Sequence, residues 1–174
     1  DQEYGQTGKK KREDAPFKPQ NLLFATKVAF YEMGSKIAEQ YGMNLIWARI
    51  FFVYGFGQRS KALIPYLATS LRSGVLPEIK NPYGANDFIY VDDVVRALCM
   101  LINSKPKSRN EVYNVGFGKL TPTADVIRAV FKFFKKSTPS FPPRPHGKMV
   151  LKGSYADIAK IKRDLGWRPY VPLE

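Results

Sequence analysis

Cysteine and histidine are almost absent from this chain, which has one residue of each among 174. A zinc site usually takes four ligands drawn largely from these two residue types, so a structural zinc centre is excluded. No apolar run approaches the ~20 residues needed to span a bilayer, and no secretory signal opens the chain. These absences fit a reducing cytoplasm. Cys99 lies within the apolar helical pattern "VVRALCMLI" and is expected to be a buried structural thiol.

The glycine patterns that bind phosphate are also missing. Neither G-x-G-x-x-G nor G-x-x-x-x-G-K-[ST] occurs anywhere in the sequence. The stretches "GFGQRS" from Gly55 and "GFGKLT" from Gly116 have two glycines each. Both lack the third glycine and the strand–turn–helix context, so as phosphate loops they are weak.

Acidic residues are few: 15 against 28 basic residues, for a formal net charge of +13. Such a balance favours contact with polyanions, either nucleic acid or phosphorylated small molecules. Only "KKKR" at 9–12 forms a block, and the other basic residues are scattered. A solvated loop explains that block more simply than a nucleic-acid surface does, although a basic nucleic-acid-binding domain stays open as an alternative. An acidic segment missing from this chain would also explain the excess.

Helices are expected where apolar residues recur at three- and four-residue spacing. The longest such stretch runs from Leu22 to Tyr41, with Asn21 as N-cap and Gly42 as a left-handed stop. A second helix is expected at 62–71, and a third runs to Leu101 with Asp92 and Asp93 as its capping residues. A fourth helix is expected after Thr121 as cap, with Pro122 at its first position. A short fifth helix is expected between Asp157 as cap and Gly166 as stop.

Three β-prone segments alternate with these helices: "NLIWARIFFVYG", "DFIYV" and "EVYNVG". The first is apolar on both faces, which is typical of a strand inside a parallel sheet covered by helices. Alternation of strands and helices predicts an α/β fold with parallel pairing. The chain opens at Asp1 with the polar, turn-rich "DQEYGQTGKKKREDAPFKPQ", so we expect a loop entered from an upstream segment.

Several motifs then occur in a recognisable order: "EYGQTG", "NLLFATKVAF", "YGMNLIWARIFFVYGFGQRS", "NDFIYVDDVVRAL", "EVYNVGFGKLT" and "DIAKIKRDLGW". From Glu3 to Trp167 the chain resembles the carboxyl-terminal part of the extended short-chain dehydrogenase/reductase family, in particular its NAD(P)-dependent sugar-nucleotide epimerases and dehydratases. The resemblance implies the C-terminal part of a Rossmann-type parallel sheet plus a small α/β substrate-binding lobe. Residues 1–60 would be the remnant of the cofactor domain. Residues 61–174 would form mainly the substrate-binding lobe, with some segments returning to the Rossmann sheet.

The resemblance assigns a catalytic role to Lys27 and exposes a departure at Leu23. The family carries a tyrosine four residues before this lysine, which places both side chains on one helical face. There the ammonium lowers the pKa of the phenol and contacts the cofactor ribose. Leucine cannot transfer a proton, and the family's Gly-rich loop and Ser/Thr hydroxyl would lie upstream of Asp1. Tyr31 is a possible substitute for the tyrosine, but it follows Lys27 by one turn, and packing in the core is the simpler role.

Other positions matching the family carry cofactor and substrate roles. The resemblance places Phe51 beside the nicotinamide of the cofactor. Phe52 stands where the family usually has a substrate-binding Asn, and Asn86 where it often has an Arg on the diphosphate. Asn supplies no charge, so a bidentate clamp is lost there. Arg59 and Arg144 are the expected diphosphate ligands, with solvated surface arginines as the alternative for both.

Two further groups are expected to be structural: Asp92 and Asp93 as helix caps, and Tyr4 as a packed anchor of the first loop. The resemblance implies an epimerase or dehydratase for a nucleotide-diphosphate sugar, using NAD or NADP, and the departures from the family predict that this chain is truncated and inactive alone. A non-catalytic module that binds a sugar nucleotide or a protein is the alternative. An unpaired sheet edge predicts self-association or dependence on the missing N-terminal segment.

Overall fold

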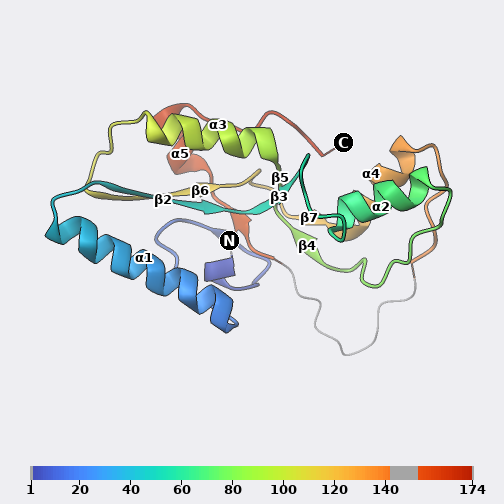
Figure 1. Ribbon diagram of the computed structural model, residues 1–174, viewed down its shortest axis with the longest axis horizontal. Helices are drawn as coiled ribbons and strands as arrows, with labels where there is room; N and C mark the ends of the chain where they lie inside the picture. The colour runs from blue at the N-terminus through green and yellow to red at the C-terminus, as the bar shows by residue number, and fades with distance from the viewer. Residues whose placement is uncertain (1, 142–152, 174) are drawn as a thin grey trace.

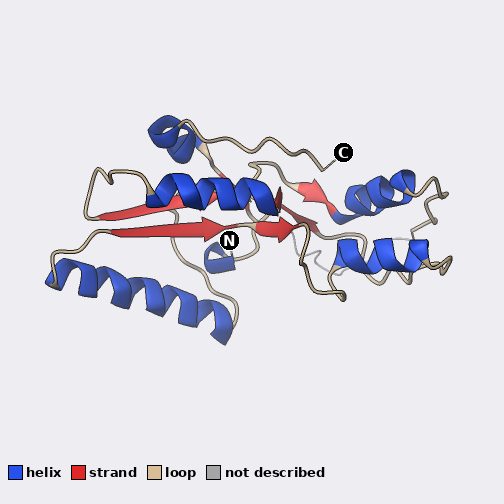
Figure 2. Ribbon diagram, turned by 45° about the horizontal axis from the view of Figure 1, so that its top comes forward, coloured by secondary structure: helices blue, strands red, loops and turns tan. Residues whose placement is uncertain are grey.

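The computed structural model describes residues 2–141 and 153–173, and its main part is a parallel β-layer between helices (Figures 1 and 2). Helix α1 lies against one face of strands β2 and β6, while α3 and α5 lie on the other. This arrangement confirms the predicted α/β class with parallel pairing. The principal elements are α1 (Leu22–Gln40), β2 (Leu45–Ile50), β3 (Phe52–Tyr54), α2 (Leu63–Arg72), β4 (Ala85–Asn86), β5 (Phe88–Tyr90), α3 (Val91–Ile102), β6 (Asn110–Val115), β7 (Thr121–Pro122), α4 (Thr123–Phe133) and α5 (Ala159–Leu165).

The predicted strand "NLIWARIFFVYG" is divided into β2 and β3 at Phe51. Strand β2 pairs with β6 in parallel, from Leu45 opposite Asn110 to Ile50 opposite Val115. The Phe51 amide still donates to the Val115 carbonyl at 2.9 Å, but the next amide, of Phe52, donates to the Asp87 carbonyl. From there β3 pairs with β5. The chain therefore changes its pairing partner at Phe51 and Phe52.

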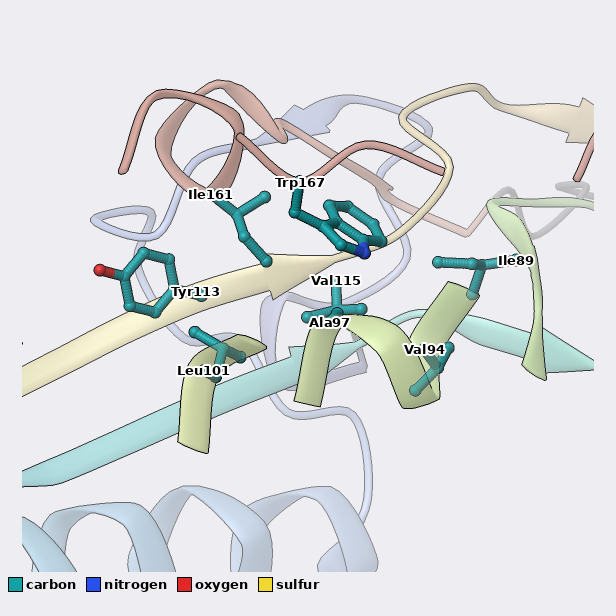
Figure 3. Close-up of a cluster of buried hydrophobic side chains, with 8 residues drawn as sticks. All are labelled: Ile89, Val94, Ala97, Leu101, Tyr113, Val115, Ile161 and Trp167. Atoms are coloured by element: carbon teal, nitrogen blue, oxygen red, sulfur yellow. The ribbon is translucent and has the colours of Figure 1, made fainter. Parts of the chain in front are cut away.

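The main hydrophobic core lies between the β-layer and helices α3 and α5 (Figure 3). Helix α3 contributes Val94, Ala97 and Leu101, whose three- and four-residue spacing defines its buried face. Trp167, which is fully buried, follows α5 and donates its indole N–H to the Asp93 carbonyl at 3.2 Å. This core fixes the C-terminal segment against the sheet.

A second lobe is formed by α2, α4 and the antiparallel pair β4–β7 (Figure 1). Helices α2 and α4 bury Leu67, Leu71, Ile127 and Phe131 against each other. Strand β1 (Lys10–Lys11) pairs with β8 (Tyr155–Ala156), and the 3-10 turn η1 (Gln2–Tyr4) opens the described chain.

Several predicted helix ends are confirmed. The Asn21 side chain accepts from the Phe24 amide at 3.0 Å, and Gly42, which follows the C-cap of α1, has a left-handed φ of +66°. At α5, the Asp157 carboxylate accepts from the Ala159 amide, and Gly166 terminates the helix. No helix among residues 2–141 and 153–173 is both long and apolar enough to cross a membrane.

Two structural predictions are wrong. Cys99 is exposed, because it lies two positions, or about 200°, around α3 from the buried Ala97. Thr121 and Pro122 do not start a helix: they form β7, and α4 begins at Thr123 without a side-chain cap. Pairing of Thr121 with Asn86 holds both residues in extended conformation.

The predicted capping role of Asp92 and Asp93 is also wrong, although both lie in the first turn of α3. No side chain caps that helix. The buried Asp93 carboxylate instead accepts from the amides of Tyr170 and Val171 and pairs with Arg96 at 2.6 Å. It attaches the C-terminal segment to α3.

Candidate functional site

A cleft of about 650 Å³ opens where β2 gives way to β3. In α/β folds, ligands bind at the carboxyl ends of strands, near points where the pairing order changes. Lys27, Phe51, Phe52 and Arg59, four of the residues that the sequence places at a site, line this one cleft. Its remaining lining residues are Gln2, Glu3, Phe24, Trp47, Ala48, Arg49, Ile50, Val53 and Gln58.

The other two predicted substrate residues do not line this cleft. Asn86 lies on β4 in the second lobe, where it pairs with Thr121. Arg144 lies outside the described residues.

Helix α1 presents Lys27 to the cleft but provides no proton-transfer group beside it. Leu23, one turn earlier, is 62% exposed, and the Thr26 hydroxyl donates to its carbonyl at 2.8 Å. The Lys27 side chain is exposed and makes no ion pair within the described parts of the chain. Serine, threonine and tyrosine do not occur among the described lining residues. The Lys27 amine can bind an anionic group and the phenylalanine rings can pack on a planar one, but the described lining supplies no hydroxyl acid or base.

Beneath the cleft, Arg49 forms a buried cluster that our sequence analysis missed. The residue is 3% exposed, and its guanidinium pairs with the Glu3 carboxylate at 3.0 Å. It also donates to the Tyr4 hydroxyl at 2.6 Å and to the Glu13 carbonyl at 2.8 Å. The sequence carried one signal for it: Arg49 is the single charged residue in the apolar segment "NLIWARIFFVYG". A buried cation needs partners from other segments of the chain, so this position predicts a buried ion pair.

Aromatic rings enclose this guanidinium. Tyr4, Phe17 and Tyr31 lie with their ring centroids 4.6–5.5 Å from the Arg49 Cζ. Tyr31 also packs on Trp47, so its ring is part of the cluster that joins α1 to β2. It does not line the cleft, which argues against the substitute role considered for it.

Tyr4 anchors the first loop, as expected from the sequence. Its hydroxyl donates to Asn114 Oδ1 at 2.8 Å while accepting from Arg49. Burial raises the pKa of Tyr4 to about 12, although the hydrogen bond from Arg49 acts in the opposite direction. The phenol therefore stays protonated at neutral pH, and its role is structural.

Asp87 connects the two lobes: it lies between β4 and β5, where its carbonyl accepts from the Phe52 amide at the start of β3. Its carboxylate accepts from the amides of Phe117 at 2.7 Å, Gly118 at 3.0 Å and Ala156 at 2.8 Å. Burial nonetheless raises its pKa to about 6. The Gly116 backbone lies so close to Asp87 that a side chain would not fit there: a Cβ at Gly116 would lie 2.7 Å from both Asp87 Oδ2 and the Ala156 Cβ.

Four polar atoms in the cleft wall are buried and lack hydrogen-bond partners among the described residues, and two of them, Glu3 Oε2 and Arg49 Nε, form an ion pair with each other. The other two are Trp47 Nε1 and Gln58 Oε1. An unpaired buried donor or acceptor is costly, so such atoms favour a ligand that can bond to them. Together with the Lys27 amine and the phenylalanine walls, they suit a ligand that has hydroxyl or amide groups beside a planar ring.

Comparison with known proteins identifies the family. Residues 1–116 match the model of the NAD dependent epimerase/dehydratase family. This chain belongs to that family. An uncharacterised protein of Methanocaldococcus jannaschii is 31% identical over 166 residues, which are 93% of this chain and 49% of that protein. The dTDP-4-dehydro-6-deoxyglucose reductase of Escherichia coli is 27% identical over 177 residues, covering 98% of this chain and 54% of the relative.

Solved structures of the family share the fold. The UDP-glucose 4-epimerase of Thermus thermophilus, determined with NAD, superposes with a TM-score of 0.81 at 25% identity, over 98% of this chain and 56% of that one. The UDP-glucuronic acid 4-epimerase of Bacillus cereus, bound to UDP-glucuronic acid and NAD, gives 0.84 at 23% identity, over 99% and 55%. The chain thus spans about half the length of these family members.

Proposed function

We propose that this chain carries the substrate-side part of an NAD(P)-dependent site for a nucleotide-diphosphate sugar. The observation that supports the proposal is the meeting of Lys27, Phe51, Phe52 and Arg59 in one cleft at the strand switch. Family membership and the nucleotide sugars named for the relatives point to the same ligand class. In this proposal residues 1–60 face the cofactor, and residues 61–174 supply mainly the substrate lobe.

Each residue then has a distinct role. When bound, the dinucleotide would accept a hydride from a carbon of the sugar. Lys27 would hold its ribose, and Phe51 would pack beside the nicotinamide. Arg59 would neutralise the substrate diphosphate. Phe52 would contact the sugar, and Asn86 would approach the same substrate from the second lobe. Arg144, which lies outside the described residues, stays proposed as a diphosphate ligand.

We propose further that the chain binds these ligands without turning them over by itself. A positioned proton donor or acceptor contributes about 10²–10⁴-fold to rate. Leucine replaces the family tyrosine at position 23, and no hydroxyl among the described residues lines the cleft. Binding without catalysis is therefore the second candidate function.

Replacing Lys27 by Met should weaken NADH binding at least ten-fold, because the ribose loses its cationic partner. Isothermal titration of the natural full-length protein with NADH, NADPH and UDP-glucuronic acid would measure this. Lys36→Met, at an exposed position on the same helix, is the matched control, since Lys36 forms an ion pair with Glu39 and does not line the cleft. Equal affinity in both variants would remove Lys27 from the site. Salt-sensitive binding of random oligonucleotides without any sugar-nucleotide binding would overturn the whole proposal.

Introducing the missing phenol by Leu23→Tyr should raise turnover of UDP-glucuronic acid by 10²-fold or more, given the usual contribution of a positioned acid/base. Chromatographic separation of the product epimers in the natural full-length protein would measure the rate. Leu23→Phe supplies the ring without the hydroxyl and should leave the rate unchanged. A rise with both variants, or with neither, would contradict the placement of position 23 beside the reacting sugar.

Self-association is a further proposal, which rests on α1. Phe30, Met33 and Ile37 recur along this helix at three- and four-residue spacing and are each 49–64% exposed. A contiguous apolar stripe of this kind marks an interaction surface. A second copy of the chain, or another segment of the same protein, would cover it.

A further inference from the structure

A groove of about 820 Å³ lies along helices α2 and α4, and it shares no lining residue with the cleft described above. We call it the α2–α4 groove. The two helices already bury one face against each other through Leu67, Leu71, Ile127 and Phe131. The groove is a second, uncovered face of the same helix pair, and nothing in the proposed function uses it.

The groove is lined by residues from both helices. Along α2 it is lined by Ile64, Ala68 and Arg72, and along α4 by Asp125, Ala129 and Phe133. Both sets repeat at i, i+4 and i+8, which corresponds to about 12 Å along each helix. An alanine stands in the middle of each wall. Small residues at the centre leave room for a side-chain row of another helix, as in helix-in-groove recognition.

The apolar lining of the groove includes both buried and exposed side chains. Val126 is fully buried at its floor, whereas Phe133 is 81% exposed. An exposed aromatic ring beside an apolar channel is characteristic of an interaction surface.

The charge of the groove is positive. Three cations line it, Arg72, Arg128 and Lys132, against one carboxylate, Asp125. Arg128 is neutralised by Asp125 at 2.6 Å. Arg72 and Lys132 have no ion-pair partner among residues 2–141 and 153–173, so two exposed cations flank an apolar channel.

We propose that the α2–α4 groove binds an acidic amphipathic helix of a partner protein. The paired i, i+4, i+8 walls fit a helix with apolar residues at i, i+4 and i+7, and the two unpaired cations fit carboxylates beside that stripe. A second copy of this chain is a poor occupant of this groove, because its own excess of basic residues would meet Arg72 and Lys132, whereas the stripe on α1 proposed for self-association is apolar. The complementary charge has to come from an acidic partner.

A fluorescent 16-residue peptide with leucines at i, i+4, i+7 and i+11 and glutamates beside them is a direct probe, measured by anisotropy on the natural full-length protein. We expect saturable binding that weakens as salt is raised. Ala129→Leu fills the groove and should weaken binding at least ten-fold. The matched control is Ala29→Leu at an exposed position on α1, where binding should be unchanged. Circular dichroism and thermal melting verify that both variants fold.

The charges are tested by reversing them. Arg72→Glu with Lys132→Glu should weaken the glutamate peptide at least ten-fold and should strengthen a version with lysines in place of glutamates. The control pair Lys105→Glu and Lys162→Glu changes the net charge equally outside the groove. Absence of saturable binding below millimolar peptide, equal binding of the lysine version to the unmodified protein, or equal loss in the control pair would overturn the proposal.

Discussion

Replacing Arg49 by Met should lower the free energy of unfolding by about 3–5 kcal/mol, the usual cost of removing one partner from a buried ion pair. The substitution keeps much of the side-chain volume. It leaves the buried Glu3 carboxylate without the guanidinium that lies 3.0 Å away in the natural protein. It also removes hydrogen bonds to Tyr4 and to the Glu13 carbonyl. Urea unfolding of the natural protein and the variant gives the difference.

Two comparisons make this result specific. Arg128→Met breaks an exposed pair with Asp125 at 2.6 Å and should cost less than about 1 kcal/mol. Adding Glu3→Gln to Arg49→Met removes the stranded charge, so the double variant should be more stable than Arg49→Met alone. If Arg49→Met is no worse than Arg128→Met, the buried cluster does not hold the first loop to the sheet.

Stability should also depend on the protonation of Asp87, by up to about 3 kcal/mol. Burial raises the pKa of this carboxyl from its ordinary value of 3.8 to about 6. Between these two values the folded protein holds a proton that the unfolded chain has lost. The contribution of Asp87 to stability is therefore fully present below about pH 4 and is lost as the pH rises through about 6. A pKa difference of about two corresponds to about 3 kcal/mol.

The measurement compares the unfolding free energies of the natural protein and of Asp87→Asn from pH 4 to pH 7. The natural protein should lose stability relative to the variant as the pH rises across this range. Asp92→Asn, at an exposed position on α3, reports what the loss of one carboxylate does by itself. A difference that stays constant from pH 4 to pH 7, or that changes in the opposite direction, would contradict a raised pKa at Asp87.

Local signals predicted the regular elements well, because each depends on neighbours in sequence. Asn21 caps α1 and Gly166 ends α5, as their side-chain chemistry and backbone freedom dictate. Cys99 shows the limit of this approach. Its segment is apolar except for Arg96, so only the choice of face by Val94, Ala97 and Leu101 decides that the thiol is exposed.

Predictions failed where a distant segment competes with a local preference. Thr121 and Pro122 have the chemistry of a helix start, yet pairing with β4 draws them into a strand. Asp93 has the chemistry of a cap, yet the amides of Tyr170 and Val171 bind its carboxylate. In both cases a hydrogen bond between segments far apart in the chain replaces the local one.

By itself the sequence determined the α/β class and the order of the elements, since these follow from periodicity and from residue identity, while the placement of Leu23 at the family's tyrosine position stays a prediction. Only the tertiary structure decided that Lys27, Phe51, Phe52 and Arg59 line one cleft. Tertiary packing also decided that Arg49 and Asp87 are the buried charges beneath and beside it. The physical reason is that burial and ion pairing depend on which distant segments meet.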